Sequence, residues 1–335
     1  MKKLIYSVAI IAGALLGTSC EDLLDRENYS KTDTGSFPKT ETDAEQIVTA
    51  CYNVLITMSN NDIENRTVYT HDMISDDMYG AGSTSNVGAQ SFDRLMSSAT
   101  NFMASAWKDY YTGVFRCNYA LEEIPKLSNE VFKNTENKNY LLGQAHFLRA
   151  WFFWELTNNF ETFPLLTETT PTNKPRSSVD SIYTQIVEDL RTAIKLMPAK
   201  YGYSQEAGRS GRATKYAAEA LMGRIWLFYT GFYGKSEMCG VKKDEVLAWL
   251  KDVRDKSGFG LVNDPRELWP YTNEYSSGFA YQTDFNTYAS KNNLHWVGNR
   301  SQETIFGFHY SYVWYASGSA GYNRFGEYCG LRNTA

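Results

Sequence analysis

The chain has 335 residues, with 38 acidic and 33 basic side chains and a formal net charge of −5 at pH 7. This acidic balance argues against a nucleic-acid partner, which needs a clustered basic face, and against attachment to anionic lipid through charge. The hydrophobic share of 43% is enough for a substantial core. Aromatic residues make up 15% of the chain, a high share that the function should explain.

Residues 1–19 have the composition of a secretory signal peptide. Lys2 and Lys3 precede an apolar run over residues 4–16, and three small residues then lead to Cys20. The apolar run is too short to span a bilayer as a stable anchor. A cysteine directly after the small residues predicts lipid attachment at Cys20; the alternative is an ordinary signal peptide with a coincidental cysteine. We expect a protein anchored to a membrane by lipid and not spanning it.

The beginning of the mature chain is predicted to be a tether followed by a helix and a long loop. Residues 20–38 are polar and suit an extended tether. Thr42 and Glu45 match a capping box, and apolar residues then recur at helical spacing as far as Leu55. Residues 59–104 lose this periodicity and gain Asn, Asp, Ser and Gly, so we expect a loop region there.

Five more helices are predicted in the rest of the chain. The second should stop near Pro125, Ser178 (or Ser177) should cap the fourth and Thr214 the fifth. Asn158 or Asn159 should end the third in a left-handed conformation. The five helices are expected from Trp107 to Ile124, over 139–158, from Val179 to Met197, from Ala217 to Phe228 and near 243–255. One strand-like run follows at 304–308.

This pattern predicts a mostly α fold. The helices come in pairs with small residues at the crossings, which favours helix-turn-helix repeats of the tetratricopeptide kind, although no strict 34-residue period is visible. The long loops between them are rich in aromatic residues. We treat residues 39–335 as one α-helical domain behind the signal peptide (1–19) and the tether (20–38).

The cysteines and the helical arginines are expected to be structural. Cys51 and Cys117 fall in apolar helical patterns and should be small core residues. The wide spacing of the cysteines and the lack of a C-x-x-C motif predict neither a disulfide framework nor a zinc site. The helical arginines are Arg149, Arg212 and Arg224, and we expect them to form ion pairs, with Glu155 or Glu219 as partners.

Five segments of the chain carry a family pattern. Residues 143–153 read G-Q-A-H-F-L-R-A-W-F-F and residues 164–168 read P-L-L-T-E. Residues 176–183 (R-S-S-V-D-S-I-Y), 211–215 (G-R-A-T-K) and 301–306 (S-Q-E-T-I-F) follow in order. Behind a lipoprotein start, these segments resemble the SusD/RagB family of outer-membrane lipoproteins from Bacteroidetes, over residues 20–310.

The resemblance implies a tetratricopeptide-like binding protein on the cell surface. Its ligands would be glycans or peptides, and its partner a SusC-like TonB-dependent transporter. Glu21 and Asp22, directly after Cys20, resemble the acidic export signal of surface lipoproteins, so we expect the outer membrane and an outward-facing position. Members of the family are much longer, so we expect that a C-terminal part is missing here, which would leave residues 20–335 alone poorly soluble or partly molten. The family usually has Gly-Asp-x-Pro where this chain has residues 161–164, so the helix end should be built differently.

The loops offer the side chains that sugars bind. A flat aromatic ring buries the C–H face of a sugar, and planar amide, carboxylate and guanidinium groups bind its hydroxyls. Two segments, 69–93 and 269–315, interleave such residues outside helical periodicity. For any single aromatic, local packing of the loop is the alternative. The predicted ligand-binding residues are Trp314, Tyr315, Trp296, Tyr79, Asp76, Asp77 and Asn299.

Catalysis is not expected. Glycoside hydrolysis needs two carboxylates at a set distance, and Asp76 and Asp77 are adjacent and cannot flank a bond as such a pair. The four histidines lie in no metalloprotease or triad-like motif, and no phosphate-binding glycine loop or cofactor motif is present. The main reading is therefore a glycan-binding lipoprotein without catalytic, metal or cofactor residues. A peptide-binding member of the family and a lipid-anchored glycoside hydrolase remain the alternatives.

The lipid anchor gives a direct prediction. Cys20→Ala should release the protein from the membrane fraction, because two or more acyl chains hold a protein stably at a membrane and their loss leaves no other anchor. Fractionation after salt and carbonate washes measures this. A variant that stays with the membranes would show that the lipoprotein interpretation is wrong.

Overall fold

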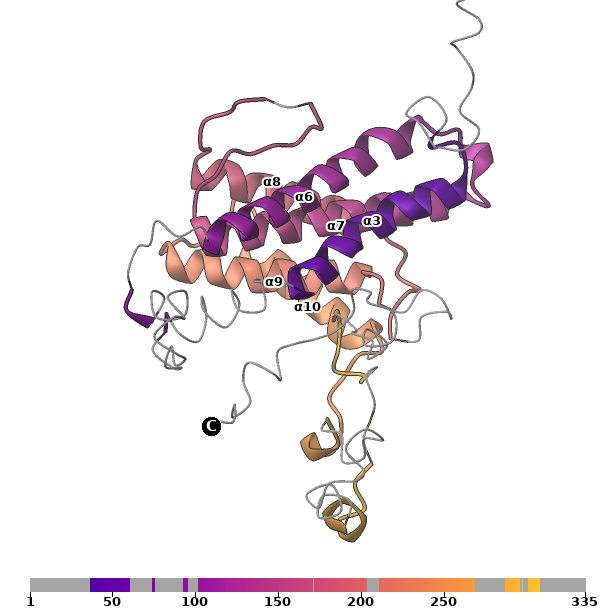
Figure 1. The fold of residues 1–335 in the computed structure, drawn as a ribbon. Coiled ribbons are helices and arrows are strands. Elements are labelled where there is room, and N and C mark those ends of the chain that lie inside the picture. The colour runs from indigo at the N-terminus through magenta and orange to yellow at the C-terminus, as the bar shows by residue number, and fades with distance from the viewer. Residues whose placement is uncertain are drawn as a thin grey trace, which may run out of the picture. The chain divides into compact units, whose positions relative to one another are not determined.

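The structure is a computed structural model that describes residues 37–60, 74–75, 93–95, 102–170, 172–203, 211–268, 287–295, 297 and 301–307. The chain divides into Met1–Lys39 and Thr40–Ala335, and every described helix lies in the second unit. The α-helices labelled in Figure 1 are α3 (Glu41–Asn60), α6 (Phe102–Glu123), α7 (Thr135–Phe160), α8 (Val179–Leu196), α9 (Lys215–Phe232) and α10 (Lys243–Lys256). Short 3₁₀ helices are η2 (Ile124–Lys126), η3 (Asn129–Val131) and η4 (Pro265–Leu268).

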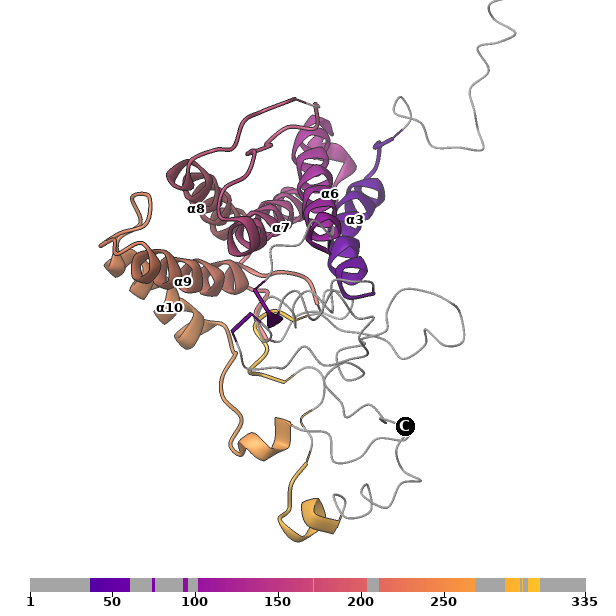
Figure 2. The ribbon, with the colours of Figure 1, turned by 60° about the vertical axis from the view of Figure 1, so that its left-hand side comes forward.

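Each α-helix packs against the next one in the chain, so the described helices form an array (Figures 1 and 2). Helix α7 also contacts α3, which places it between α3 and α6 on one side and α8 on the other. Stacking of neighbouring helices is how helical repeat proteins build a continuous core. The predicted mostly α, tetratricopeptide-like fold is confirmed.

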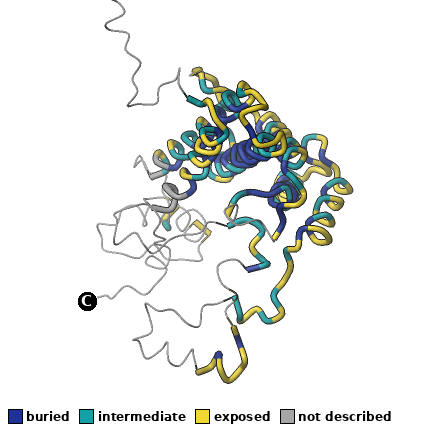
Figure 3. Tube along the Cα trace, turned by 90° about the vertical axis from the view of Figure 1, so that its right-hand side faces the viewer, coloured by how far each residue is buried: buried dark blue, intermediate teal, exposed yellow. Residues whose placement is uncertain are grey.

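Helix α7 is the buried centre of this array. Fourteen of its 26 residues are buried, and Figure 3 shows the buried residues concentrated in the middle of the helices. Its neighbours approach closely at two glycines. A Cβ on Gly113 of α6 would lie 2.4 Å from the Phe152 ring, and one on Gly143 would lie 2.5 Å from Cγ of Met197. The small residues expected at helix crossings are therefore required by contact distance.

Two of the predicted helix caps are confirmed and one is wrong. Ser178 and Thr214 accept hydrogen bonds from the backbone N–H groups of Ser181 and Ala217. The first helix is capped two residues earlier than Thr42 and Glu45 predict. Thr40 accepts from the Asp43 N–H (3.2 Å) and the Asp43 carboxylate accepts from the Thr40 N–H (2.9 Å). Aspartate can close the same reciprocal pair as glutamate, which is why the earlier start was overlooked.

The end of α7 also differs from the prediction. The helix continues through both asparagines to Phe160, and the left-handed residue is Glu161, with φ of 58°. Asn159 stays helical because its side-chain amide donates to the Glu155 carbonyl (2.8 Å) and to the Tyr110 hydroxyl (3.3 Å). The departure from the family's Gly-Asp-x-Pro pattern thus puts a glutamate in a conformation that usually favours glycine.

The strand expected at 304–308 is not present in its described part. Residues 301–307 form turns and bends, and Phe308 lies outside the described residues. A strand needs a neighbouring strand, but the backbone bonds here are a turn from the Thr304 N–H to the Ser301 carbonyl and one bond from Gly260 to Gln302. The apolar run instead packs Phe306 edge-on against Phe147 of α7, with ring centroids 5.0 Å apart.

The G-R-A-T-K segment joins three helices. Gly211 has φ of 85°, which favours glycine. Arg212 donates to the Thr49 hydroxyl of α3 (2.9 Å). The Ala213 N–H donates to the Tyr52 hydroxyl (2.8 Å), and the Ala213 carbonyl accepts from Tyr140 of α7 (3.1 Å). The segment therefore fixes the start of α9 against α3 and α7.

A buried ionic network lies between α6, α7 and α8. Asp189 of α8 is 1% exposed and accepts two hydrogen bonds from the Arg149 guanidinium (2.7 and 2.9 Å). His146 Nδ1 lies 2.7 Å from the same carboxylate. Burial alone would raise the pKa of Asp189, but hydrogen bonds from His146 and Arg149 outweigh it and hold the pKa below its ordinary value. The partner of Arg149 is thus Asp189, not the glutamates predicted.

Asn118 extends this network to α6 and to the following loop. Its side-chain oxygen accepts from Arg149 (2.9 Å), and its amide nitrogen donates to the carbonyls of Leu166 (3.0 Å) and Glu168 (3.2 Å). The P-L-L-T-E segment is therefore held through its backbone.

We expect Arg149→Met to lower the free energy of unfolding by about 3–5 kcal/mol, because it leaves the Asp189 carboxylate buried without its main counter-charge. The double variant Arg149→Met/Asp189→Leu should recover part of this loss, since no unpaired charge remains. Urea unfolding followed by circular dichroism measures both.

The matched control is Arg191→Ala, which removes an arginine from an exposed ion pair with Glu245 and should change stability by less than about 1 kcal/mol. Equal losses for Arg149→Met and the control would contradict a dominant role for the buried network.

Candidate functional site

All residues predicted to bind ligand lie outside the described residues. They are Tyr79, Asp76 and Asp77 of the first loop, and Trp296, Asn299, Trp314 and Tyr315 of the second. The predicted lipid site, Cys20, lies outside them as well. These assignments stay predictions. The site is therefore built from the described segments that border the second loop.

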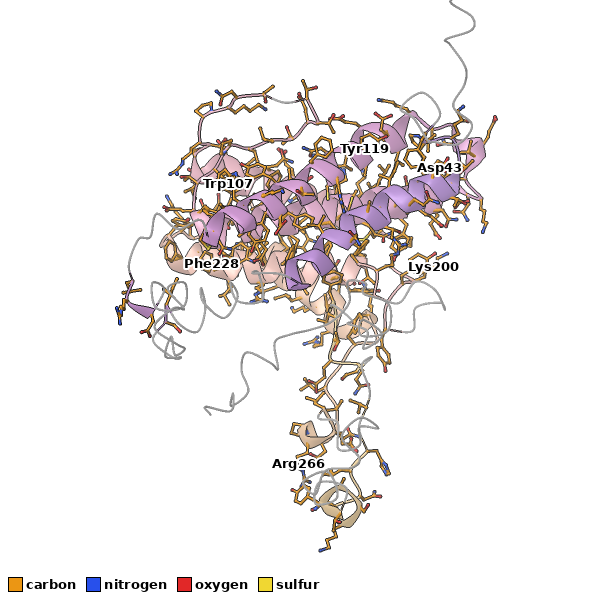
Figure 4. The ribbon with its side chains drawn as sticks, viewed as in Figure 1. Asp43, Trp107, Tyr119, Lys200, Phe228 and Arg266 are labelled. Atoms are coloured by element: carbon orange, nitrogen blue, oxygen red, sulfur yellow. The ribbon has the colours of Figure 1, made fainter. Side chains whose placement is uncertain are left out.

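A polar cluster borders that loop on η4 and residues 287–297. We call it the Arg266 cluster, after the residue labelled in Figure 4. The Arg266 guanidinium donates to the Asp264 carboxylate (2.6–3.1 Å) and to the Tyr288 hydroxyl (3.1 Å). Glu267 accepts from the backbone N–H of His295 with its carboxylate (3.2 Å) and from that of Val297 with its carbonyl (3.0 Å). These bonds join the two ends of the segment 269–286.

The chemistry of the Arg266 cluster suits a ligand with hydroxyl groups and an apolar face. The Tyr288 side chain is 46% exposed, and its hydroxyl is held by Arg266. Hydrogen bonds with Asp264, and then with Tyr288, raise the pKa of Arg266, while the bond from Arg266 lowers the pKa of Asp264, so both stay charged at neutral pH. An exposed ring beside fixed donors and acceptors is the arrangement that binds sugars.

Tyr288 lies in the segment 269–315, where ligand-binding aromatics are expected, but η4 and Arg266 were not predicted. A signal for them exists. Asp264 followed by Pro265 is an N-cap residue followed by proline at the first helical position, which predicts a helix start. The pairing of Arg266 with Tyr288 had no signal, because the two residues meet only after the chain has folded back.

A second exposed aromatic surface lies at the end of α9. Phe228, labelled in Figure 4, and Phe232 stack nearly parallel (8°, centroids 5.3 Å apart) and are 39% and 68% exposed. Trp154 of α7 packs edge-on behind Phe228. Trp154 is 6% exposed and belongs to the core, whereas Trp107 and Trp151 are partly exposed. Trp226 is partly exposed and donates to the Val241 carbonyl (2.9 Å).

Two glutamates in the helical array have perturbed acidity. Burial raises the pKa of Glu155 to about 7, although the charge of Arg224, one of the arginines expected to pair with it, opposes the rise. Burial likewise raises the pKa of Glu219 to about 7, opposed by Lys215, whose ammonium lies 3.2 Å away. Such shifts can mark catalytic acids. Glu219, however, is 1% exposed between packed helices, and we assign it to the core.

The described residues also bear on metals and membranes. No group of three or more His, Cys, Asp or Glu side chains among them could hold a metal ion. Of the helices described, none combines the length and the apolar character that crossing a membrane requires.

The acidity of Glu219 predicts how stability depends on pH. Its pKa is higher in the folded state (about 7) than in the unfolded state. The folded state therefore binds the Glu219 proton more tightly than the unfolded state does. The stability that this proton binding contributes is present at low pH and is lost as pH rises from about 4.5 to about 7.

Glu219→Gln should remove this contribution, so the fall in the free energy of unfolding between pH 5 and pH 8 should be smaller in the variant than in wild type. Urea titrations at both pH values measure the difference, with Glu245→Gln, on the exposed face of α10, as control. If the two variants show the same pH dependence as wild type, Glu219 does not carry the effect.

Comparison with known proteins identifies what this architecture is similar to. The model of the SusD-like family, described as "Starch-binding associating with outer membrane", matches residues 22–227. SusD-like protein P25 of Formosa agariphila is 22% identical over 284 residues, which cover 80% of this chain and 49% of that protein. The chain thus spans about half the length of this curated relative.

Two solved structures share the fold. A laminarin-binding SusD-like protein has a TM-score of 0.55 and 24% identity, covering 72% of this chain and 50% of that one. Surface glycan-binding protein A from Bacteroides fluxus has a TM-score of 0.58 and 24% identity, covering 69% of this chain and 48% of that one. At these identities the likeness establishes the fold.

Proposed function

The chain belongs to the SusD-like family, and from this premise we propose that it is a cell-surface lipoprotein that binds oligosaccharides. It would capture the glycan outside the cell and deliver it to a SusC-like TonB-dependent transporter in the outer membrane, held there by a lipid on Cys20. The work is binding and delivery, without bond chemistry and without a cofactor.

The observation that carries this proposal is the family match over residues 22–227, a family described as starch-binding and associated with the outer membrane. Two structural neighbours point the same way, since one is a laminarin-binding protein and the other is a surface glycan-binding protein. Both name glycans, and this supports a glycan over a peptide.

The geometry of the Arg266 cluster supports the same proposal. It borders the loop that carries most of the predicted ligand aromatics, and it presents a half-exposed ring with fixed charged groups beside it. We propose Trp314 and Tyr315 as the first stacking rings, with Trp296 and Tyr79 next. Asp76, Asp77 and Asn299 would bind the sugar hydroxyls.

The proposed site gives a mutational prediction. Trp314→Ala should weaken oligosaccharide binding tenfold to a hundredfold, because losing one stacking ring costs about 1–3 kcal/mol by analogy with bases stacked on aromatics. Isothermal titration of wild type and variant measures this, starting from a panel that includes laminarin and starch oligosaccharides.

The control is Phe115→Ala, which removes an aromatic side chain that is 51% exposed on α6. It should leave affinity unchanged, and the helical circular dichroism of both variants should match wild type. Equal affinities of Trp314→Ala and wild type would move the site elsewhere. Binding of peptides with no binding of any glycan would favour the peptide-binding alternative.

A further inference from the structure

Two buried cysteines lie together between α3 and α6. Cys51 and Cys117 are both 0% exposed, and both are free thiols in the structure. Burial, followed by contact with the Cys51 thiol, raises the pKa of the Cys117 thiol well above its ordinary value. The two sulfurs are therefore neighbours, and the cysteines form a pair within one helix interface.

The register of the two helices is fixed at this level. Arg116, directly before Cys117, donates from its guanidinium to the Ala50 carbonyl, directly before Cys51, at 2.7 Å. At the start of α3, Glu41 accepts from the Lys133 backbone N–H (3.0 Å) in the segment after α6. The helices thus run antiparallel, as Figure 1 shows, and the Arg116–Ala50 bond places Cys51 and Cys117 at the same level of the interface.

Apolar residues line part of the core around the pair, and the charged Arg149–Asp189 network lies near Cys117. Val48, one turn before Cys51, and Ala120, one turn after Cys117, are 0% exposed. An isolated buried cysteine usually serves as a small hydrophobic side chain. A disulfide, by contrast, requires two Cα atoms 4.4–6.8 Å apart with their side chains facing each other. Both cysteines are fully buried where α3 packs against α6, and the Arg116–Ala50 bond joins the residues directly before them, which brings the two side chains into the same part of the interface.

Although the spacing of the cysteines in the sequence predicts no disulfide framework, we propose that Cys51 and Cys117 form a single disulfide bond that joins α3 to α6 in the exported protein. The two thiols lose two protons and two electrons as the sulfur–sulfur bond forms, and the electrons reduce the disulfide of a protein thiol–disulfide oxidoreductase. The proposal depends on export to an oxidising compartment, which residues 1–19 predict. It does not depend on the ligand.

The burial of the pair determines when the bond forms. Thiolate is the attacking species in disulfide exchange, and a raised pKa together with full burial suppresses it. Oxidation therefore takes place before α3 and α6 have closed on each other. The bond then restricts the unfolded chain across the long segment between the helices, which is how a disulfide stabilises a fold.

Peptide mapping of the exported, unreduced protein tests the proposal. Trypsin should release residues 40–66 and 117–126, each with one of the two cysteines. Alkylation in denaturant before digestion should leave the two peptides joined, and a reductant should separate them. Recovery of both peptides separately alkylated without reductant would overturn the proposal.

A second experiment distinguishes whether the helix geometry permits the disulfide from whether the oxidising compartment forms it. Protein made without residues 1–19 and refolded from denaturant with reduced and oxidised glutathione should form the same link, whereas the folded, reduced protein should resist oxidation. Failure of the link to form on refolding would show that the geometry is wrong. If the link forms on refolding but is absent from the exported protein, the proposal is overturned, because the compartment does not oxidise the two thiols.

Thermal unfolding gives the energetic readout. A reductant should lower the Tm of the exported protein by roughly 5–10 °C. The double variant Cys51→Ala/Cys117→Ala should show no such dependence, while Cys239→Ala, which removes a cysteine from the loop before α10, should respond as wild type does. A wild-type Tm that does not change with reductant would contradict the stabilising role.

Discussion

The Arg149–Asp189 pair is the constraint on which the described helical array depends. A carboxylate that is 1% exposed is costly to bury unless its oxygens are paired and hydrogen-bonded. Here Arg149 and His146 of α7 supply those bonds, and Asn118 of α6 orients the guanidinium and holds the backbone of the loop after α7. One ionic centre therefore determines how α6, α7, α8 and that loop meet.

The positions of the family segments in the structure explain what these segments do for the fold. The segment 143–153 contains Gly143, where α7 meets the end of α8, and the arginine that binds α8. The G-R-A-T-K segment fixes α9 through Gly211, Arg212 and the backbone of Ala213. The resemblance is thus carried mainly by residues that hold the scaffold together. It identifies the fold directly, and it points to a ligand only through the description of the family as starch-binding.

The helical scaffold and the proposed binding surface have different physical requirements. Core helices are specified by close packing and by paired buried polar groups, whereas a sugar-binding surface needs exposed rings and polar groups that remain free to bind. The Arg266 cluster has an exposed ring, Tyr288, whose position is fixed by its hydrogen bond with Arg266. Loops can therefore change ligand while the helices keep the fold.

The sequence by itself determined the helices and two of their caps, Ser178 and Thr214, because helical spacing, capping and glycine requirements act over a few residues. It misplaced the start of α3, where Asp43 takes the capping role, and the end of α7, where Glu161 is the left-handed residue. It also predicted a strand at 304–308, where the described residues form turns and bends. Only the tertiary structure decided the long-range partners: Asp189 for Arg149, Thr49 for Arg212, Tyr288 for Arg266 and Cys117 for Cys51. A charged or thiol side chain accepts many partners of similar chemistry, and only the packing of the helices selects one of them.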